Sequence, residues 1–259
     1  YQKGIPRLTS PQWFTFLLAT TCYDVMTLAF VISLDYTAVG NAVILANSLA
    51  LILLIGKIFV GDKVTLMEGC GAIVAFGGAA LCSKDSADSR GDGSNALLGD
   101  CLAICAAIGG VGYLIFAKTS RSNMPMYVFM FLTMSVGAFE AWMFQLFILG
   151  EESTFDMDYS HGVWAFLLPV YDRLPLELVT VIICNLMGTM GYVRAMQHFD
   201  NLVISSAALM EPVVAEFLAF AFGVGQLPGL QGWVGNALVA GGTFAVIYKD
   251  GKGKSPAAH

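Results

Sequence analysis

Residues 38–60 read AVGNAVILANSLALILLIGKIFV, with one basic side chain, Lys57, and no acidic one. About 20 mostly apolar residues in a helix are needed to cross the hydrocarbon core of a bilayer, because a helix rises 1.5 Å per residue. The stretch is long enough for that crossing and too apolar for a solvated surface. It therefore predicts a transmembrane helix.

The rest of the chain repeats this pattern. Of its 259 residues 57% are hydrophobic and only 12% are charged, and the mean hydropathy is +0.71. This composition favours lipid over water as the surroundings. We predict an all-α membrane protein with eight transmembrane helices. The other seven are expected at Trp13–Leu34, Leu66–Cys82, Asn95–Ala117, Met126–Leu149, Leu176–Met196, Leu202–Val224 and Leu230–Tyr248.

Two long polar connections divide the chain. Residues 84–94 are rich in Ser, Asp and Gly and predict a solvated linker between a first unit, 1–83, and a second unit, 95–249. Residues 250–259 form a polar tail. In the second connection, the apolar patch 162–170 is too short to span a bilayer and carries Trp164, so it predicts a shallow interfacial helix.

The basic residues predict the orientation, because Lys and Arg are retained on the cytoplasmic side. With eight helices, only Lys84, Arg90 and Arg173 lie on one side. The other side, which holds both termini, carries the rest, and we expect it to be cytoplasmic. These residues are Lys3, Arg7, Lys57, Lys63, Lys118, Arg121, Arg194, Lys249, Lys252 and Lys254.

The sequence also contains a weak internal repeat. The segment that starts at Tyr36 aligns with the segment that starts at Phe199, at an offset of 163 residues, and the glycines that follow match after a one-residue slip. The paired helices are five spans apart, and an odd displacement reverses orientation, so the two copies would be inverted. Two helices of the second copy lack partners in the first. We therefore expect two further spans before Trp13 and ten in the intact protein.

Three loose motifs carry a resemblance to a known family: Leu34-Asp-Tyr-Thr-Ala, Gly99-Asp100 at a helix start, and Met210-Glu-Pro-Val-Val-Ala. With the glycine-marked final helices, they resemble the EamA-type members of the drug/metabolite transporter superfamily. The resemblance implies two inverted five-helix repeats and secondary transport of a small polar metabolite. The chain departs from the family where a Glu often precedes the tight turn, at Gly61-Asp62 and Gly225-Gln226.

Acidic side chains inside the predicted spans are the first candidates for binding or coupling. Each costs roughly 2.5–3.5 kcal/mol to insert and should face the protein interior or water. Asp24 lies beside Tyr23 in the first helix, Glu140 in the fifth, and Glu211 and Glu216 in the seventh. Such a carboxyl is suited to carrying a proton, and proton coupling is a further hypothesis. The alternative is that each carboxyl accepts hydrogen bonds and only fixes packing.

Polar residues in the two repeat-related helices are further candidates. Pro212 removes a backbone donor and frees a carbonyl near Ala208, and broken helices often border substrate sites. Hydrogen bonding between helices is the alternative for the polar side chains. These are Asn41, Asn47 and Ser48 in one helix and Ser205 and Ser206 in the other. Lys57 and Arg194 are expected to extend to the lipid headgroups.

No enzymatic or metal site is predicted. The three histidines, His161, His198 and His259, are dispersed, and the six cysteines lack metal-ligand spacing. We expect no cofactor, no metal and no nucleic-acid partner. The expected partners are a small-molecule substrate, the lipid bilayer and, as an open alternative to a monomer, a second copy in a homodimer. An integral-membrane enzyme acting on lipid-soluble substrates, and a receptor or scaffold, remain the other function classes.

Overall fold

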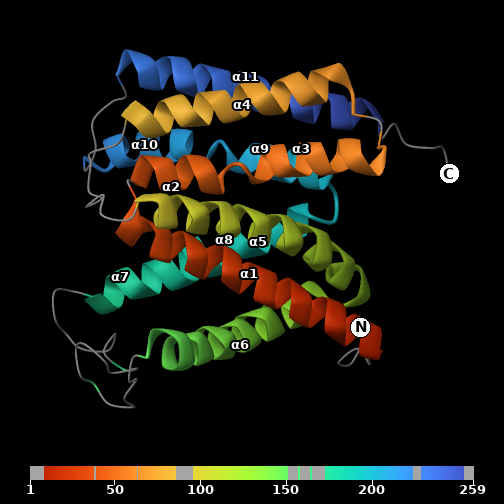
Figure 1. Ribbon diagram of the computed structural model, residues 1–259, viewed down its shortest axis with the longest axis vertical. Helices are drawn as coiled ribbons and strands as arrows, with labels where there is room; N and C mark the ends of the chain where they lie inside the picture. Colours follow the sequence, from red (N-terminus) through yellow and green to blue (C-terminus); the bar gives the residue numbers. More distant parts are fainter. Residues whose placement is uncertain are drawn as a thin grey trace. The chain divides into compact units, whose positions relative to one another are not determined.

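A computed structural model of the chain describes residues 9–37, 39–62, 64–85, 96–150, 157, 164, 173–223 and 229–253 (Figure 1). All secondary structure within these ranges is helical, which confirms the predicted all-α class. Five of the helices described there are long and apolar enough to cross a membrane. They are Ser10–Tyr36, Asn41–Val60, Ala96–Asn123, Met126–Ile148 and Leu230–Tyr248.

The other three predicted spans are helical as well, but they are shorter or interrupted. Leu66–Leu81 is an apolar helix below the length of a full span. The predicted helices at 176–196 and 202–224 are each divided into shorter elements. Eight membrane crossings therefore stay a prediction.

Many large apolar side chains face outward. Phe59 and Leu66 are 86% and 85% exposed, while Thr20, Ser33 and Thr133 are buried. Extended exposed apolar surface marks a contact with another protein or with lipid. This distribution is compatible with an integral membrane protein whose helices contact lipid.

The helices form two compact units that interleave along the sequence. Unit 1 contains Tyr1–Asp24 and Phe116–His198, and unit 2 contains Val25–Ile115 and Phe199–His259. Two long helices, α1 (Ser10–Tyr36) and α5 (Ala96–Asn123), contribute to both units.

In unit 1, the first half of α1 packs against α6 (Met126–Phe144). The rings of Phe16 and Phe129 meet edge to face with centroids 6.0 Å apart, and both are fully buried. The element after α6 is a π-helical turn, η2 (Gln145–Leu149), which ends at Gly150 with a positive φ of 67°. The unit continues with α7 (Arg173–Val179), a second π-helical stretch, η4 (Thr180–Met187), and α8 (Gly188–Ala195).

Unit 2 is built around a close pair of helices, α4 (Leu66–Asp85) and α11 (Leu230–Gly253), which lie side by side in Figure 1. A Cβ atom at Gly71 would lie 2.8 Å from the carbonyl oxygen of Gly242, and one at Gly78 would lie 2.7 Å from that of Gly235. The absence of side chains at these positions is what lets the two backbones approach.

Two helices of unit 2 are interrupted at their middles; the sequence predicted a break near Pro212 in one of them and a continuous span at 38–60 in the other. The first is α2 (Val39–Ala46) followed by α3 (Leu49–Val60), and the second is α9 (Asn201–Ala208) followed by α10 (Glu211–Ala221). Pro212 accounts for the second interruption because it has no N–H to donate. The first has no proline; its turn is formed by Asn47 and Ser48, side-chain types that compete with the helical hydrogen bonds of the backbone.

Several predicted features fall outside the described residues. The linker is described only at Lys84 and Asp85, which continue α4, and the interfacial helix at 162–170 only at Trp164. The tail is described as far as Gly253, where α11 ends.

Substitution of adjacent glycines in α4 tests the packing of α4 against α11. Gly78→Ala would place its methyl group 2.6 Å from the backbone nitrogen of Val239, and we expect a loss of about 1–3 kcal/mol. Gly77→Ala, whose Cβ meets nothing within 4 Å, is the matched control and should be neutral or stabilising by up to ~1 kcal/mol. Thermal denaturation of the detergent-purified protein measures both, and equal effects would contradict this packing.

Candidate functional site

Two of the acidic candidates meet in unit 1. The carboxyl of Asp24 on α1 interacts with the carboxyl of Glu140 on α6. The hydroxyl oxygen of Thr21 lies 3.2 Å from Glu140 Oε1 and 3.1 Å from the carbonyl oxygen of Leu17, so its one proton can be donated to either acceptor. The pair therefore has a hydroxyl donor that can switch between the carboxylate and the backbone.

A glycine makes room for the Asp24 carboxyl. A Cβ atom at Gly137, one turn before Glu140, would lie 2.9 Å from Asp24 Oδ1. The other carboxyl oxygen of Asp24, Oδ2, is buried without a hydrogen-bond partner. Two carboxyls in contact repel each other when both are charged, and one proton held between them removes that repulsion. This arrangement is suited to binding one proton.

The other members of the predicted set lie in unit 2, apart from Tyr23, which is half-buried on α1. Asn47 and Ser48 form the turn between α2 and α3 and are half-buried. Asn41 is exposed on α2, Glu211 is exposed at the start of α10, and the side chains of Pro212 and Glu216 lie outside the described set.

Ser205 and Ser206 are buried in α9, just before its interruption. Ser205 donates its hydroxyl to the carbonyl oxygen of Leu202 at 3.0 Å, a bond within its own helix. The Ser206 hydroxyl is buried without a hydrogen-bond partner, while the Ser206 carbonyl accepts a bond from Thr243 of α11 at 3.0 Å. Of these two serines, Ser206 is therefore the one whose hydroxyl can still form a hydrogen bond with another polar group.

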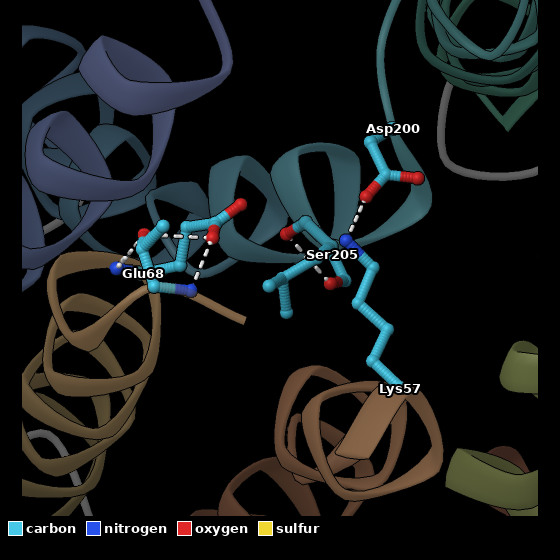
Figure 2. A network of polar contacts seen from close by, with 6 residues as sticks. Lys57, Glu68, Asp200 and Ser205 are labelled. Carbon is cyan, nitrogen blue, oxygen red and sulfur yellow. Dashed lines mark hydrogen bonds and ion pairs between the residues drawn. The ribbon is translucent and has the colours of Figure 1, made fainter. Parts of the chain in front are cut away.

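Figure 2 shows polar contacts that the sequence did not reveal. Lys57, in the last turn of α3, forms an ion pair with Asp200, which directly precedes α9. This ion pair differs from the extension to the lipid headgroups that the sequence predicts for Lys57. Asp200 was missed because it lies just outside a predicted span; its position before a helix start is typical of an N-cap residue, but its side chain makes no capping bond.

Glu68, also in Figure 2, has a structural role. Its carboxylate accepts bonds at 2.8 Å from both the backbone N–H and the hydroxyl of Thr65, three residues earlier. The Glu68 N–H donates in return to the Thr65 hydroxyl oxygen at 3.4 Å, which completes a capping box at the start of α4. It places a charged residue in an apolar helix without implying a binding role.

Two of the motifs that carry the family resemblance contact each other within unit 2. The Thr37 hydroxyl donates to Asp100 Oδ1 at 2.8 Å, and a Cβ atom at Gly99 would lie 2.8 Å from the backbone nitrogen of Thr37. The Gly99-Asp100 pair therefore joins the start of α5 to the end of α1. Both residues serve packing and hydrogen bonding.

Comparison with known proteins finds structures of similar fold but does not assign the chain to a family. No protein-family model matches the sequence, and no curated protein matches it. Fifteen chains of solved structures resemble the fold. One of them, a crystal structure of a protein described no further, aligns at a TM-score of 0.73 with 16% identity and covers 96% of this chain and 80% of its own. At that identity the likeness concerns the fold alone.

A double-mutant cycle tests the contact between the two carboxyls. Asp24→Asn and Glu140→Gln should give stability changes that are not additive, with a coupling of about 0.5–3 kcal/mol, because each substitution alone already changes the one interaction that the two carboxyls share. The measurement is the denaturation midpoint of the two single variants and the double variant. Asp24→Asn combined with Asp62→Asn, an exposed acid of the other unit, is the control and should be additive.

Proposed function

We propose that this protein is a multi-pass secondary transporter that moves a small polar metabolite by alternating access between two inverted repeats. The observation that carries the proposal is the equal spacing of the two interrupted helices in unit 2. Inverted repeats with broken helices at the centre are the design of many secondary transporters.

The boundaries of the two interrupted helices correspond at an offset of 162, except that α10 ends one residue before the equivalent of the α3 end. Val39–Ala46 corresponds to Asn201–Ala208, and the turn at 47–48 corresponds to the turn at 209–210. Gly61 and Gly223, which end the second halves with φ of 84° and 71°, obey the same offset. Sequence alignment alone suggested 163, and the agreement to within one residue supports the repeat.

The glycine contacts between α4 and α11 support the same symmetry. In the part of the proposed repeat that follows, the offset is 164, so Gly71 is equivalent to Gly235 and Gly78 is equivalent to Gly242. The contacts join Gly71 to Gly242 and Gly78 to Gly235, so each contact is the image of the other. A self-complementary contact of this kind is what a two-fold axis produces.

Interrupted helices also supply the chemistry that a polar substrate needs. Helical hydrogen bonding would pair the Ala208 carbonyl with the N–H four residues later, but that residue is Pro212, which has none. Irregular backbone at membrane depth is tolerated where it is buried in protein or lines a cavity. Carbonyls at such interruptions are therefore available to bind a substrate.

We extend the proposal to the family that the motifs resemble, the EamA-type drug/metabolite transporters, with eight spans here of an expected ten and both termini cytoplasmic. The contact between Thr37 and Asp100 supports this assignment by giving two of those motifs a common structural purpose. Proton coupling is assigned to the Asp24–Glu140 pair.

Reconstitution of the full-length protein in liposomes tests the proposal. We expect uptake of at least one member of a broad panel of polar metabolites, and faster uptake when a pH gradient is imposed. Absence of flux for every compound, with the protein folded and inserted, would contradict transport.

Substitution of the carboxyl pair separates coupling from transport. Asp24→Asn or Glu140→Gln should abolish the part of uptake that depends on the pH gradient and leave exchange of substrate across the membrane, because an amide cannot take up a proton. Asp62→Asn is the matched control and should behave as the unmodified protein. Unchanged acceleration by the gradient in both variants would remove the coupling role.

A further inference from the structure

We propose that the ion pair between Lys57 and Asp200 is a latch that holds the two interrupted helices together at one membrane face only. This inference rests on the proposed function, since a latch has a purpose only if the two helices separate. It adds two residues to the transport machinery that neither the motifs nor the repeat alignment indicated.

The pair links two different repeats. Lys57 belongs to the C-terminal half of the first interrupted helix, α3, and Asp200 directly precedes the second interrupted helix, which begins with α9. The two helices pack against each other within unit 2. Figure 2 shows the lysine side chain crossing from α3 to the carboxylate in front of α9. Separation of these two helix ends must break the contact.

Each charge also lies where its own helix favours it. The C-terminal end of a helix carries partial negative charge, and Lys57 lies in the last turn of α3; the N-terminal end carries partial positive charge, and Asp200 lies at the start of α9. Both side chains are partly exposed, 24% for Lys57 and 34% for Asp200, so water can solvate each charge when the pair separates. The ion pair can thus favour the state in which the ends of α3 and α9 are together, and it can still break when the two helices separate.

The proposed repeat places no second ion pair at the positions equivalent to Lys57 and Asp200. At the offset of 162, Lys57 corresponds to Ala219 and Asp200 corresponds to Ala38. Two alanines cannot form an ion pair. The two ends of the helix pair are therefore chemically different, although the backbone interruptions are equivalent.

An asymmetric latch favours one of the two states of an alternating-access cycle. The distribution of Lys and Arg predicts that the Lys57 face is cytoplasmic. In the absence of substrate, the protein should therefore rest with its cytoplasmic side closed. Substrate or proton binding would have to offset the ion pair before the helices part.

The rate at which a buried cysteine is modified tests the latch without knowledge of the substrate. In a background without the six native cysteines, Ser205→Cys places a thiol at a 2% exposed position on α9, just over one turn after Asp200. A membrane-impermeant methanethiosulfonate is added to the cytoplasmic side of vesicles that contain the full-length protein. Lys57→Met should raise the modification rate about two- to fivefold, the range expected for a partly exposed ion pair.

Two further variants show whether charge is the cause. Asp200→Asn should raise the rate as Lys57→Met does, and it replaces that variant if the latter does not reach the membrane. The exchanged pair, Lys57→Asp with Asp200→Lys, should return the rate toward that of the parent. Asp62→Asn, which removes an exposed charge beyond the same end of α3, is the control and should leave the rate unchanged.

The outcomes separate the latch from transport itself. Rates that are equal in the parent, Lys57→Met and Asp200→Asn proteins would overturn the latch even if liposomes show flux. An accelerated rate that the exchanged pair fails to reduce would also overturn it, because a packing effect would then be the cause. An accelerated rate that the exchanged pair reverses supports the latch even where the metabolite panel shows no flux.

Discussion

The constraint on which the rest of this structure depends is the need to satisfy every backbone N–H and C=O away from water. In hydrocarbon, an unpaired backbone group costs several kcal/mol, so a spanning segment must be a helix or part of a closed barrel. All described secondary structure is accordingly helical. The same constraint makes each interruption of a helix informative, because it is tolerated only where protein or water can replace the lost hydrogen bonds.

Close packing of α4 against α11 depends on glycines, which have no side chain to separate the two backbones. In the centre of unit 2, Gly71, Gly78 and Gly242 bring the backbones of α4 and α11 together, and larger residues at these three positions could not be accommodated without a shift of backbone. Between lipid-exposed helices there is no water to expel, so contact area and van der Waals packing supply the association. Small residues increase both.

Three charged residues in the described helices have a local role that the structure shows. Glu68 caps α4, Asp100 binds Thr37, and Lys57 binds Asp200. The carboxyls of Asp24 and Glu140 are different, because they are placed against each other and one oxygen of Asp24 has no partner. An acid that insertion penalises and packing does not explain is the group on which we base coupling.

Sequence alone determined the helical class, the positions of the apolar segments, and the candidate acids at 24 and 140, because hydropathy is a property of composition along the chain and needs no knowledge of contacts. The helix boundaries on which we base the proposed repeat differ by one residue from the offset that the sequence alignment suggested. Sequence alone did not reveal that the helix at 38–60 is interrupted without a proline, since the competition between the Asn47 and Ser48 side chains and the backbone depends on local geometry.

Only the tertiary structure decided which polar residues meet. Asp24 and Glu140 are more than a hundred residues apart, as are Lys57 and Asp200, and no periodicity links the members of either pair. The close approach of Gly71 to Gly242, and of Gly78 to Gly235, likewise depends on how α4 and α11 cross. The physical reason is the same in each case. Hydropathy is a property of single residues and predicts which segments can face lipid, whereas a contact depends on how two helices that are distant in sequence pack together.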